Sequence, residues 1–184
     1  MYTLFVDTHS EYVYLSLFNE DKIYTKEIES YHEHSKIVLP TLKQLLEEAK
    51  ITFDNIESII VVNGPGSFTG IRIGLSIVKT IGYTLNIPVY PISSLTLYLI
   101  SNDTNEDKMA VIEDNKGYYI SVFDKNNNIL VNEKYIQNLD DYKQYKIVDN
   151  HIDIVKLRKY KDKLNKINIH LLKANYVKKI GVEL

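Results

Sequence analysis

Two carboxylates, those of Asp7 and Glu113, each follow directly on a short apolar run that is typical of a buried strand. A carboxylate at the end of such a strand could hold a magnesium ion or activate a water molecule. The turns that follow the two acids, THSE and DNKG, lack the early glycine that would let the backbone wrap a phosphate group. We therefore expect Asp7 and Glu113 to face a degenerate cleft that no longer processes a nucleotide.

A glycine-rich stretch, VVNGPGSFTGIRIG, lies between an apolar run and a helical pattern, which is where a phosphate cradle is usually found. It is not a P-loop, because no lysine follows Gly70, and its glycine spacing differs from the dinucleotide fingerprint. Either backbone amides of this loop bind an anion, or the loop turns the chain off a strand and a hydroxyl caps the next helix. We favour the second interpretation. The four residues concerned are Gly64, Gly66, Ser67 and Thr69.

Histidines flank Glu33 at positions 32 and 34, which places both imidazoles on one side of an extended segment. Zinc hydrolases of the HExxH kind need two histidines four residues apart on a helix, and one such pair without a third ligand rarely makes a metal site. The chain has no cysteine, which excludes disulfides, zinc-thiolate sites and thiol nucleophiles. We expect no metal and no other cofactor, and a metallopeptidase is the least favoured function.

Secondary structure must position these residues, and the hydropathy pattern predicts it. Apolar residues spaced close to one helical turn predict helices at residues 35–49 and 69–85. A continuous apolar run predicts a strand at 58–62 that is buried on both faces. The other predicted strands cover residues 2–6, 12–18, 22–28, 88–92, 109–112, 118–123, 129–136 and 146–148, and the other predicted helices cover 95–100, 152–164 and 174–179.

An internal repeat links the two halves of the chain. LFVDTHSEYVYLSLFNEDKIY resembles AVIEDNKGYYISVFDKNNNIL: in each, a strand ends in an acid and a later strand closes on Ser-apolar-Phe, with the second hairpin one residue shorter. A βββαβα unit that occurs twice, the second copy abbreviated, predicts an α/β fold of two lobes facing each other. This is the architecture of the actin-like ATPases (ASKHA, ribonuclease H-like). We assign residues 1–102 to the N-terminal lobe and 103–184 to a smaller C-terminal lobe.

The predicted helix at 69–85 contains glycines in its interior, where glycine lowers helix stability. Gly74 and Gly82 each cost about 1 kcal/mol relative to alanine in a helix interior. Gly70 and Gly74 lie one turn apart on one face, where the missing Cβ lets another backbone come close. We infer a tightly packed helix pair, within the chain or across an interface.

The composition is that of a globular protein, with 45% hydrophobic and 25% charged residues and a net charge of −2 over 184 residues. No secretory signal is evident and no run of about 18 apolar residues occurs, so we expect a cytoplasmic protein without membrane contact. Lysine and arginine crowd residues 156–179, where Asp162 is the one acid. A solvated helical face is favoured there over a nucleic-acid contact, because no RNA-binding motif accompanies the charge.

Five stretches of the sequence resemble the TsaB (YeaZ) family: FVDTH, HSKIVLPTLKQLL, NGPGSFTGIRIGLSIVKTIG, PISSL and LKANYVKK. The resemblance spans nearly the whole chain and is strongest over residues 1–100. It implies the two-lobed actin-like fold and a non-catalytic role in tRNA modification. Members of this family support the formation of N6-threonylcarbamoyladenosine beside the anticodon of tRNAs that read codons beginning with A.

The resemblance also implies partners. A TsaD-type subunit, which transfers the threonylcarbamoyl group, would form a heterodimer with this chain, and a TsaE-type ATPase would join the pair. The chain alone could form a homodimer, and any tRNA contact would be indirect or through the basic segment. The helices at 35–49 and 69–85 would supply the partner interface. Its expected residues are Val38, Leu42, Leu45, Gly70, Arg72, Gly74, Leu75 and Val78.

The second lobe departs from the family pattern. Relatives usually carry an Asp-Ala-Arg run where this chain has Glu113, Asp114 and Asn115. The departure leaves the interface helices untouched and bears only on second-lobe contacts with TsaE or tRNA. An active ATPase or small kinase of the same superfamily is the alternative function, which the fold and Asp7 motivate.

Overall fold

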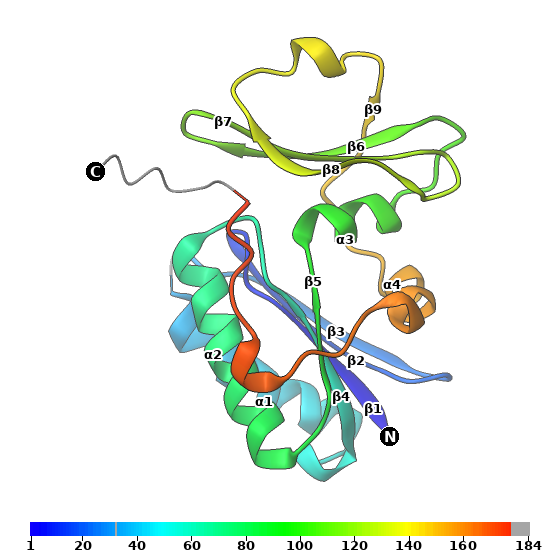
Figure 1. Cartoon of the computed structure of the whole chain (residues 1–184). Helices are drawn as coiled ribbons and strands as arrows, with labels where there is room; N and C mark the ends of the chain where they lie inside the picture. Colours follow the sequence, from blue (N-terminus) through cyan, green and yellow to red (C-terminus); the bar gives the residue numbers. More distant parts are fainter. Residues whose placement is uncertain (32, 178–184) are drawn as a thin grey trace.

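The computed structural model describes residues 1–31 and 33–177 and contains two β-sheets (Figure 1). The first sheet has the strand order β3-β2-β1-β4-β5, in which β1 runs antiparallel to β2 and parallel to β4. The predicted meander and the buried strand after it are confirmed. The strands of this first sheet are β1 (Tyr2–Asp7), β2 (Tyr12–Phe18), β3 (Ile23–Glu29), β4 (Ile56–Val62) and β5 (Val89–Ile92).

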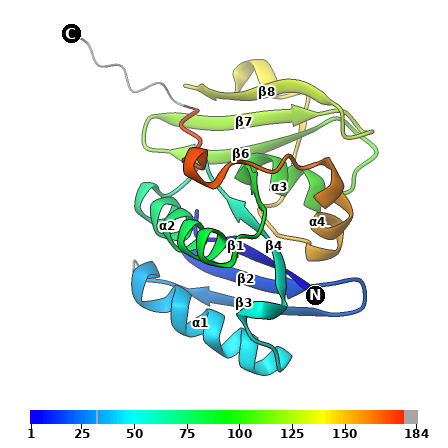
Figure 2. The ribbon, with the colours of Figure 1, turned by 60° about the horizontal axis from the view of Figure 1, so that its bottom comes forward.

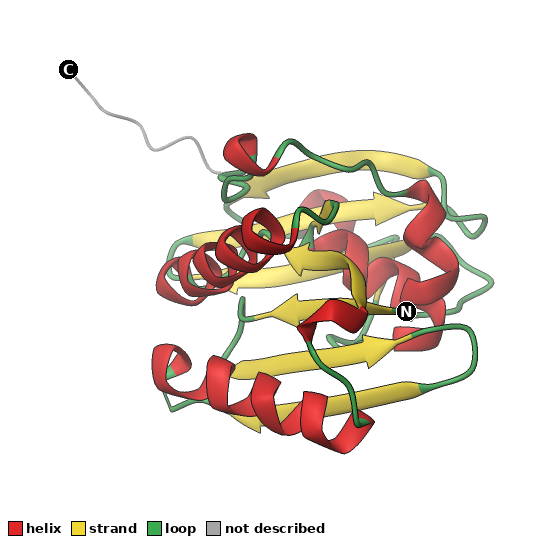
Figure 3. Ribbon diagram, turned by 90° about the horizontal axis from the view of Figure 1, so that it is seen from below, coloured by secondary structure: helices red, strands yellow, loops and turns green. Residues whose placement is uncertain are grey.

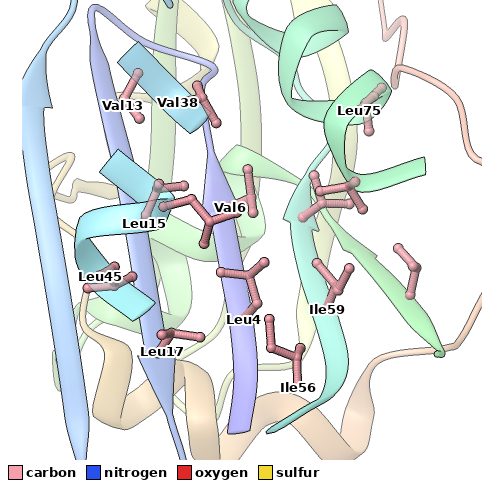
Figure 4. Close-up of a cluster of buried hydrophobic side chains, with 14 of the residues drawn as sticks. Leu4, Val6, Val13, Leu15, Leu17, Val38, Leu45, Ile56, Ile59 and Leu75 are labelled. Carbon is pink, nitrogen blue, oxygen red and sulfur yellow. The ribbon is translucent and has the colours of Figure 1, made fainter. Parts of the chain in front are cut away.

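Two long helices, α1 (His34–Ala49) and α2 (Phe68–Leu85), cover one face of the first sheet (Figure 2). They form because their apolar residues recur with the helical period, and that stripe is what they bury. Figure 4 shows side chains of both helices meeting alternate residues of β1, β2 and β4, such as Leu4, Leu15 and Ile59. Each fully buried aliphatic side chain contributes about 1.5–3 kcal/mol, so this cluster is a major source of stability.

The second sheet has the order β8-β7-β6-β9, which reproduces the order β3-β2-β1-β4 of the first. The structure therefore confirms the predicted duplication. It also confirms that the second copy is abbreviated: between β8 and β9 the chain forms only a 3-10 turn, η2 (Asp140–Tyr142), in place of a long helix. The strands of the second sheet are β6 (Lys108–Asp114), β7 (Gly117–Phe123), β8 (Ile129–Ile136) and β9 (Lys146–Ile147).

The strand register corrects one detail of the repeat. Ser16 pairs with Phe5, and its counterpart Ser121 pairs with Ala110. Counting two residues on from Phe5 and Ala110 makes Ile112, and not Glu113, the structural equivalent of Asp7. The prediction of a shorter second hairpin was wrong, because it aligned the two acids by residue type. A shift of one residue in a strand moves a side chain to the opposite face of the sheet.

Helices α3 (Ser94–Ser101) and α4 (Ile154–Tyr160) pack between the two sheets and join them into one structure (Figure 3). Their core includes Phe18 of the first sheet and its equivalent Phe123 of the second. The predicted helix at 152–164 is shorter than expected and continues into a 3-10 turn (Lys161–Lys163). Residues 174–177 are not helical, and the last two residues of the helix predicted at 174–179 lie outside the described residues. Within the described residues, every helix is too short or too polar to cross a membrane.

Candidate functional site

A cleft of about 950 Å³ opens between the two sheets. Its walls come from the turn after β1, the loop before α2, helix α3, the turn between β6 and β7, and the chain at residues 174–177. The carboxylates of Glu11, Glu113 and Asp114 line it, and the part of the lining that the structure describes includes no lysine or arginine. Phosphate groups entering this cleft would therefore meet negative charge.

A chain of three buried polar side chains ends at this cleft. The Nδ1 atom of His9 lies 2.6 Å from Oδ1 of Asp7, and its Nε2 atom lies 2.8 Å from the hydroxyl of Tyr98. With Asp7 ionised, Nδ1 donates to the carboxylate, and Nε2 of the neutral ring accepts from Tyr98. Burial raises the pKa of Tyr98 well above its ordinary value, and the charge of Asp7 adds to this shift. His9 and Tyr98 were not predicted as site residues, although His9 stands only two positions from Asp7.

The structure corrects the predicted role of Asp7. Its carboxylate is buried, and its Oδ1 atom also accepts the backbone N–H of His9 at 2.9 Å, so the side chain turns back onto its own loop. Asp7 does not line the cleft, because His9 and Tyr98 lie between its carboxylate and the cleft. Glu113 does line the cleft and is exposed, yet it has no equivalent acid opposite it. The two acids therefore do not form a facing pair.

The glycine loop serves mainly to bring the chain close to the turn after β1. Gly66 has a φ of +151°, and a Cβ atom there would lie 2.4 Å from the carbonyl oxygen of His9. The backbone N–H of Ser67 donates to that same carbonyl, and the Ser67 side chain caps α2 by accepting from the N–H of Gly70. Ser67, and not Thr69, is therefore the cap. Gly64 is buried, and Thr69 lines a groove between α1 and α2.

The helix glycines also have an internal partner. A Cβ atom on Gly70 would lie 2.0 Å from the carbonyl oxygen of Thr8, and one on Gly74 would lie 2.3 Å from the Thr8 hydroxyl. Thr8 Oγ1 donates a hydrogen bond to the carbonyl of Gly70 at 2.8 Å. The close approach inferred from the sequence is real, but it joins α2 to the turn after β1. The predicted close packing of two helices at these glycines was wrong.

Seven of the eight residues expected in the partner interface are buried inside this chain. Arg72 alone is exposed. The others pack in the core beneath α1 and α2, because the apolar stripe of each helix faces the first sheet. These seven are Val38, Leu42, Leu45, Gly70, Gly74, Leu75 and Val78. Helices α1 and α2 can meet a partner only through their outer faces.

Those outer faces enclose a shallow groove of about 480 Å³ between α1 and α2. Leu39 and Phe68 are each 53% exposed there, with Ile73 and Ile77 beside them. A sequence signal for this surface existed, because these apolar residues lie off the buried stripe of each helix. The full lining is Ser35, Leu39, Phe68, Thr69, Arg72, Ile73, Ser76 and Ile77.

The histidine segment has a structural role in the part that is described. His34 is buried, and its Nε2 atom donates to the carbonyl of Ser10 at 2.8 Å. His32 lies outside the described residues. Within residues 1–31 and 33–177, no group of three or more histidine, aspartate or glutamate side chains could hold a metal ion. Nothing in this arrangement favours metallopeptidase chemistry.

Several basic residues of segment 156–179 fasten the chain to itself. Arg158 donates to the carbonyls of Asn19 and Glu20 in the first sheet's hairpin, at 2.8 and 2.7 Å. Lys161 donates to the hydroxyl of Thr3 at 2.8 Å, and Lys156 pairs with Asp103. These three charges are therefore occupied, whereas others in the segment, such as Lys159 and Lys166, remain exposed.

Comparisons with known proteins agree with the fold. Residues 25–161 match the family described as TsaD, tRNA N6-adenosine threonylcarbamoyltransferase. A solved structure described as an uncharacterized protein with similarity to peptidase YEAZ, from Pseudomonas aeruginosa, superposes with a TM-score of 0.81. It is 16% identical, over 96% of this chain and 99% of that one. At this identity, the similarity establishes the shared fold alone.

Two curated relatives are named tRNA threonylcarbamoyladenosine biosynthesis protein TsaB. The one from Buchnera aphidicola is 33% identical over 94 residues, which is 51% of this chain and 45% of the relative. The one from Bacillus subtilis is 33% identical over 96 residues, or 52% of this chain and 42% of the relative. The chain thus matches somewhat less than half the length of these relatives. Because the family match extends over most of the sequence, the chain belongs to the TsaD family.

Proposed function

We propose that this chain is a non-catalytic subunit in the biosynthesis of threonylcarbamoyladenosine on tRNA. It docks on a TsaD-type catalytic subunit through the groove between α1 and α2. The curated names of its relatives support the pathway, and its membership of the TsaD family supports a partner of the same ancestry. A TsaE-type ATPase is the expected third member, and cytoplasmic location follows from the same assignment.

The groove is the observation that carries this proposal. Leu39 and Phe68 expose about half of their surface, although apolar side chains clustered on a helical face gain stability when they are covered. The surface is formed by two regular helices that are anchored in the core, so it is preorganised for docking. A pair of helices that presents an apolar seam suits another helix pair packed by ridges into grooves.

The cleft between the sheets supports a non-catalytic role. Asp7, one of the two acids expected to face it, is instead buried and bonded to His9. The acids that do line the cleft, Glu11, Glu113 and Asp114, would repel the phosphates of a nucleotide. No observation in the described residues favours the alternative of an active ATPase or kinase over subunit docking.

The test is co-purification of the chain with its cognate TsaD-type subunit. Leu39→Lys puts a charge into the groove at an exposed helix position, where lysine is well tolerated. We expect it to weaken the complex by more than about 100-fold, because an unpaired charge would be buried in the contact. Circular dichroism and the melting temperature should match those of the wild type.

Val155→Lys is the matched control. Val155 is another exposed apolar residue, 42% accessible, on α4 and outside the groove. It should leave complex formation and threonylcarbamoyladenosine formation unchanged. Equal co-purification of Leu39→Lys and Val155→Lys would refute the proposed docking surface.

A further inference from the structure

Arg72 is the one charged side chain among the eight residues that line the groove. It projects from α2 and is exposed. Within the described residues, no carboxylate lies within ion-pair distance of its guanidinium. A single positive charge therefore stands in a surface that is otherwise apolar or hydroxyl-bearing.

The guanidinium of Arg72 is held in a fixed position. Its Cζ atom lies 3.7 Å from the centre of the Phe68 ring, which is a cation–π contact. Its Nε and Nη2 atoms donate to the hydroxyl oxygen of Tyr176 at 3.3 and 3.1 Å. These contacts occupy one face and one edge of the guanidinium. Within the described residues, the N–H groups of Nη1 and one N–H of Nη2 have no hydrogen-bond acceptor.

Tyr176 belongs to a strap, residues 172–177, that runs along α2 toward the second sheet (Figure 1). Leu172 anchors the strap in the first core, and the N–H of Asn175 donates to the carbonyl of Asn63 at 2.7 Å. The side chain of Asn175 also donates to Glu133 of β8, at 2.6 Å. The strap is thus attached to both sheets, which fixes the acceptor that orients Arg72.

A partner that covers the groove removes Arg72 from water. An isolated charge is costly to bury, whereas a guanidinium that meets a carboxylate with good geometry is strongly compensated. We propose that the partner presents an aspartate or glutamate that binds the free edge of Arg72, with Tyr176 as the positioning residue. This inference rests on the proposed docking function and names the chemistry that the partner must supply.

The same charge disfavours a second copy of this chain as the occupant. Helix α2 carries Arg72 and Lys79 and has no acidic residue. The acids of α1, Glu47 and Glu48, lie at its far end, and Lys43 and Lys26 respectively already pair with them. Glu33, which directly precedes α1, already pairs with Lys36, so a symmetric pairing of two grooves would bring like charges together without an unpaired acid from either helix. The groove therefore selects a partner that is acidic at this point over self-association.

The test measures the dissociation constant for the cognate TsaD-type subunit by calorimetry. Arg72→Gln should weaken binding by at least about tenfold, as the loss of a buried charge pair does. Lys79→Gln is the matched control, since it removes the same charge two turns along the same helix and outside the groove lining. It should change the dissociation constant by less than about twofold.

Two further measurements separate a direct role from a structural one. Raising the salt concentration should weaken the complexes of the wild type and of Lys79→Gln more than that of Arg72→Gln, which has lost the screened pair. Tyr176→Phe removes the acceptor oxygen and keeps the ring, and it should weaken binding by about fivefold. The double variant of Arg72→Gln with Tyr176→Phe should be no weaker than Arg72→Gln alone, because the tyrosine acts through the arginine.

The outcomes distinguish the two proposals. If Leu39→Lys abolishes binding and Arg72→Gln binds as tightly as Lys79→Gln, the inference about Arg72 is overturned and the docking function stands. If Leu39→Lys binds like the wild type, the docking function is refuted and the inference falls with it. Stable self-association of the isolated wild-type chain through this groove, shown by its loss in Leu39→Lys, would overturn the stated selectivity.

Discussion

The two sheets of this protein share one topology, but their outer faces have different covers. On the first sheet, Leu4 and Leu15 lie under α1 and α2. Their register equivalents on the second sheet, Met109 and Ile120, lie under the chain that includes η2, with tyrosines such as Tyr142 packed against them. Both arrangements bury the sheet. Only the first one presents two regular helices to the outside, and this confines the candidate docking groove to that half of the molecule.

The inner faces of β2 and β7, in contrast, are alike. Phe18 and Phe123 occupy equivalent positions, and both pack in the core that holds α3 and α4. The duplicated unit therefore keeps the inner face of this strand, which helps to join the two sheets, and varies the cover of its outer face. Inner positions are constrained by both sheets at once, whereas an outer face needs only some apolar cover.

The largest expected effect breaks the contact that ties α2 to the first sheet. Gly70→Ala would place a Cβ atom 2.0 Å from the backbone oxygen of Thr8, which cannot move without distorting β1 and its turn. We expect a loss of at least about 3 kcal/mol in the free energy of unfolding, measured by denaturant titration.

Gly74→Ala offers a matched comparison, because its Cβ atom would meet only the side-chain hydroxyl of Thr8. The double variant of Gly74→Ala with Thr8→Ala should be nearly as stable as Thr8→Ala alone, because the clashing hydroxyl has been removed. The same Thr8→Ala change should not rescue Gly70→Ala. Equal rescue of both glycine variants would contradict the distinction between backbone and side-chain contact.

The first sheet is covered by helices and the second by a loop, and truncating equivalent residues beneath them tests this difference. Leu15 and Ile120 are both fully buried, at 0% exposure, in the two outer-face cores. Leu15→Ala should cost about 3 kcal/mol, because rigid helices prevent the cavity from closing, and Ile120→Ala should cost about 2 kcal/mol under a more adaptable loop. Equal losses in thermal or denaturant unfolding would show that the loop is packed as tightly as the helices.

Within the described residues, the buried polar chain has no counterpart in the second unit, where Ile112 occupies the position equivalent to Asp7. Tyr98→Phe removes the donor to His9 and should cost about 1–2 kcal/mol at neutral pH. Burial raises the pKa of Tyr98 above the unfolded value of about 10, so its stabilisation is complete below that pH and is lost as pH rises further. The difference between wild type and variant should therefore narrow above about pH 10 in unfolding experiments. A stability difference between wild type and Tyr98→Phe that widens above this pH would contradict the assigned effect of burial on Tyr98.

The smallest expected effect concerns Lys161, which lies in the 3-10 turn after α4 and contacts residues of the first sheet. Lys161→Met removes the contacts with Thr3 and Glu57 and keeps an unbranched chain. Because this pair is partly exposed, we expect a loss of less than about 1 kcal/mol. Lys159→Met, at an exposed position of the preceding helix α4, should have no measurable effect.

Much of the fold could be predicted because its signals are local. The helical periods around Leu42 and Val78 and the apolar run of β4 each identify an element without knowledge of its neighbours. The repeat was recognisable for the same reason. The site residues were predicted less well: the periodic residues of α1 and α2 were assigned to a partner, although periodicity is first of all the mark of a helix's own core.

The pattern of apolar residues and glycines by itself determined two mixed sheets, an abbreviated second unit and a close backbone approach at Gly70. Only the tertiary structure determined that the segment close to Gly70 is the turn at Thr8, and which apolar residues remain exposed in the groove. It also brought Tyr176 to Arg72 across more than half of the chain. The reason is physical: the spacing of apolar residues indicates that their side chains are buried, whereas the residues that bury them depend on contacts between segments far apart in sequence.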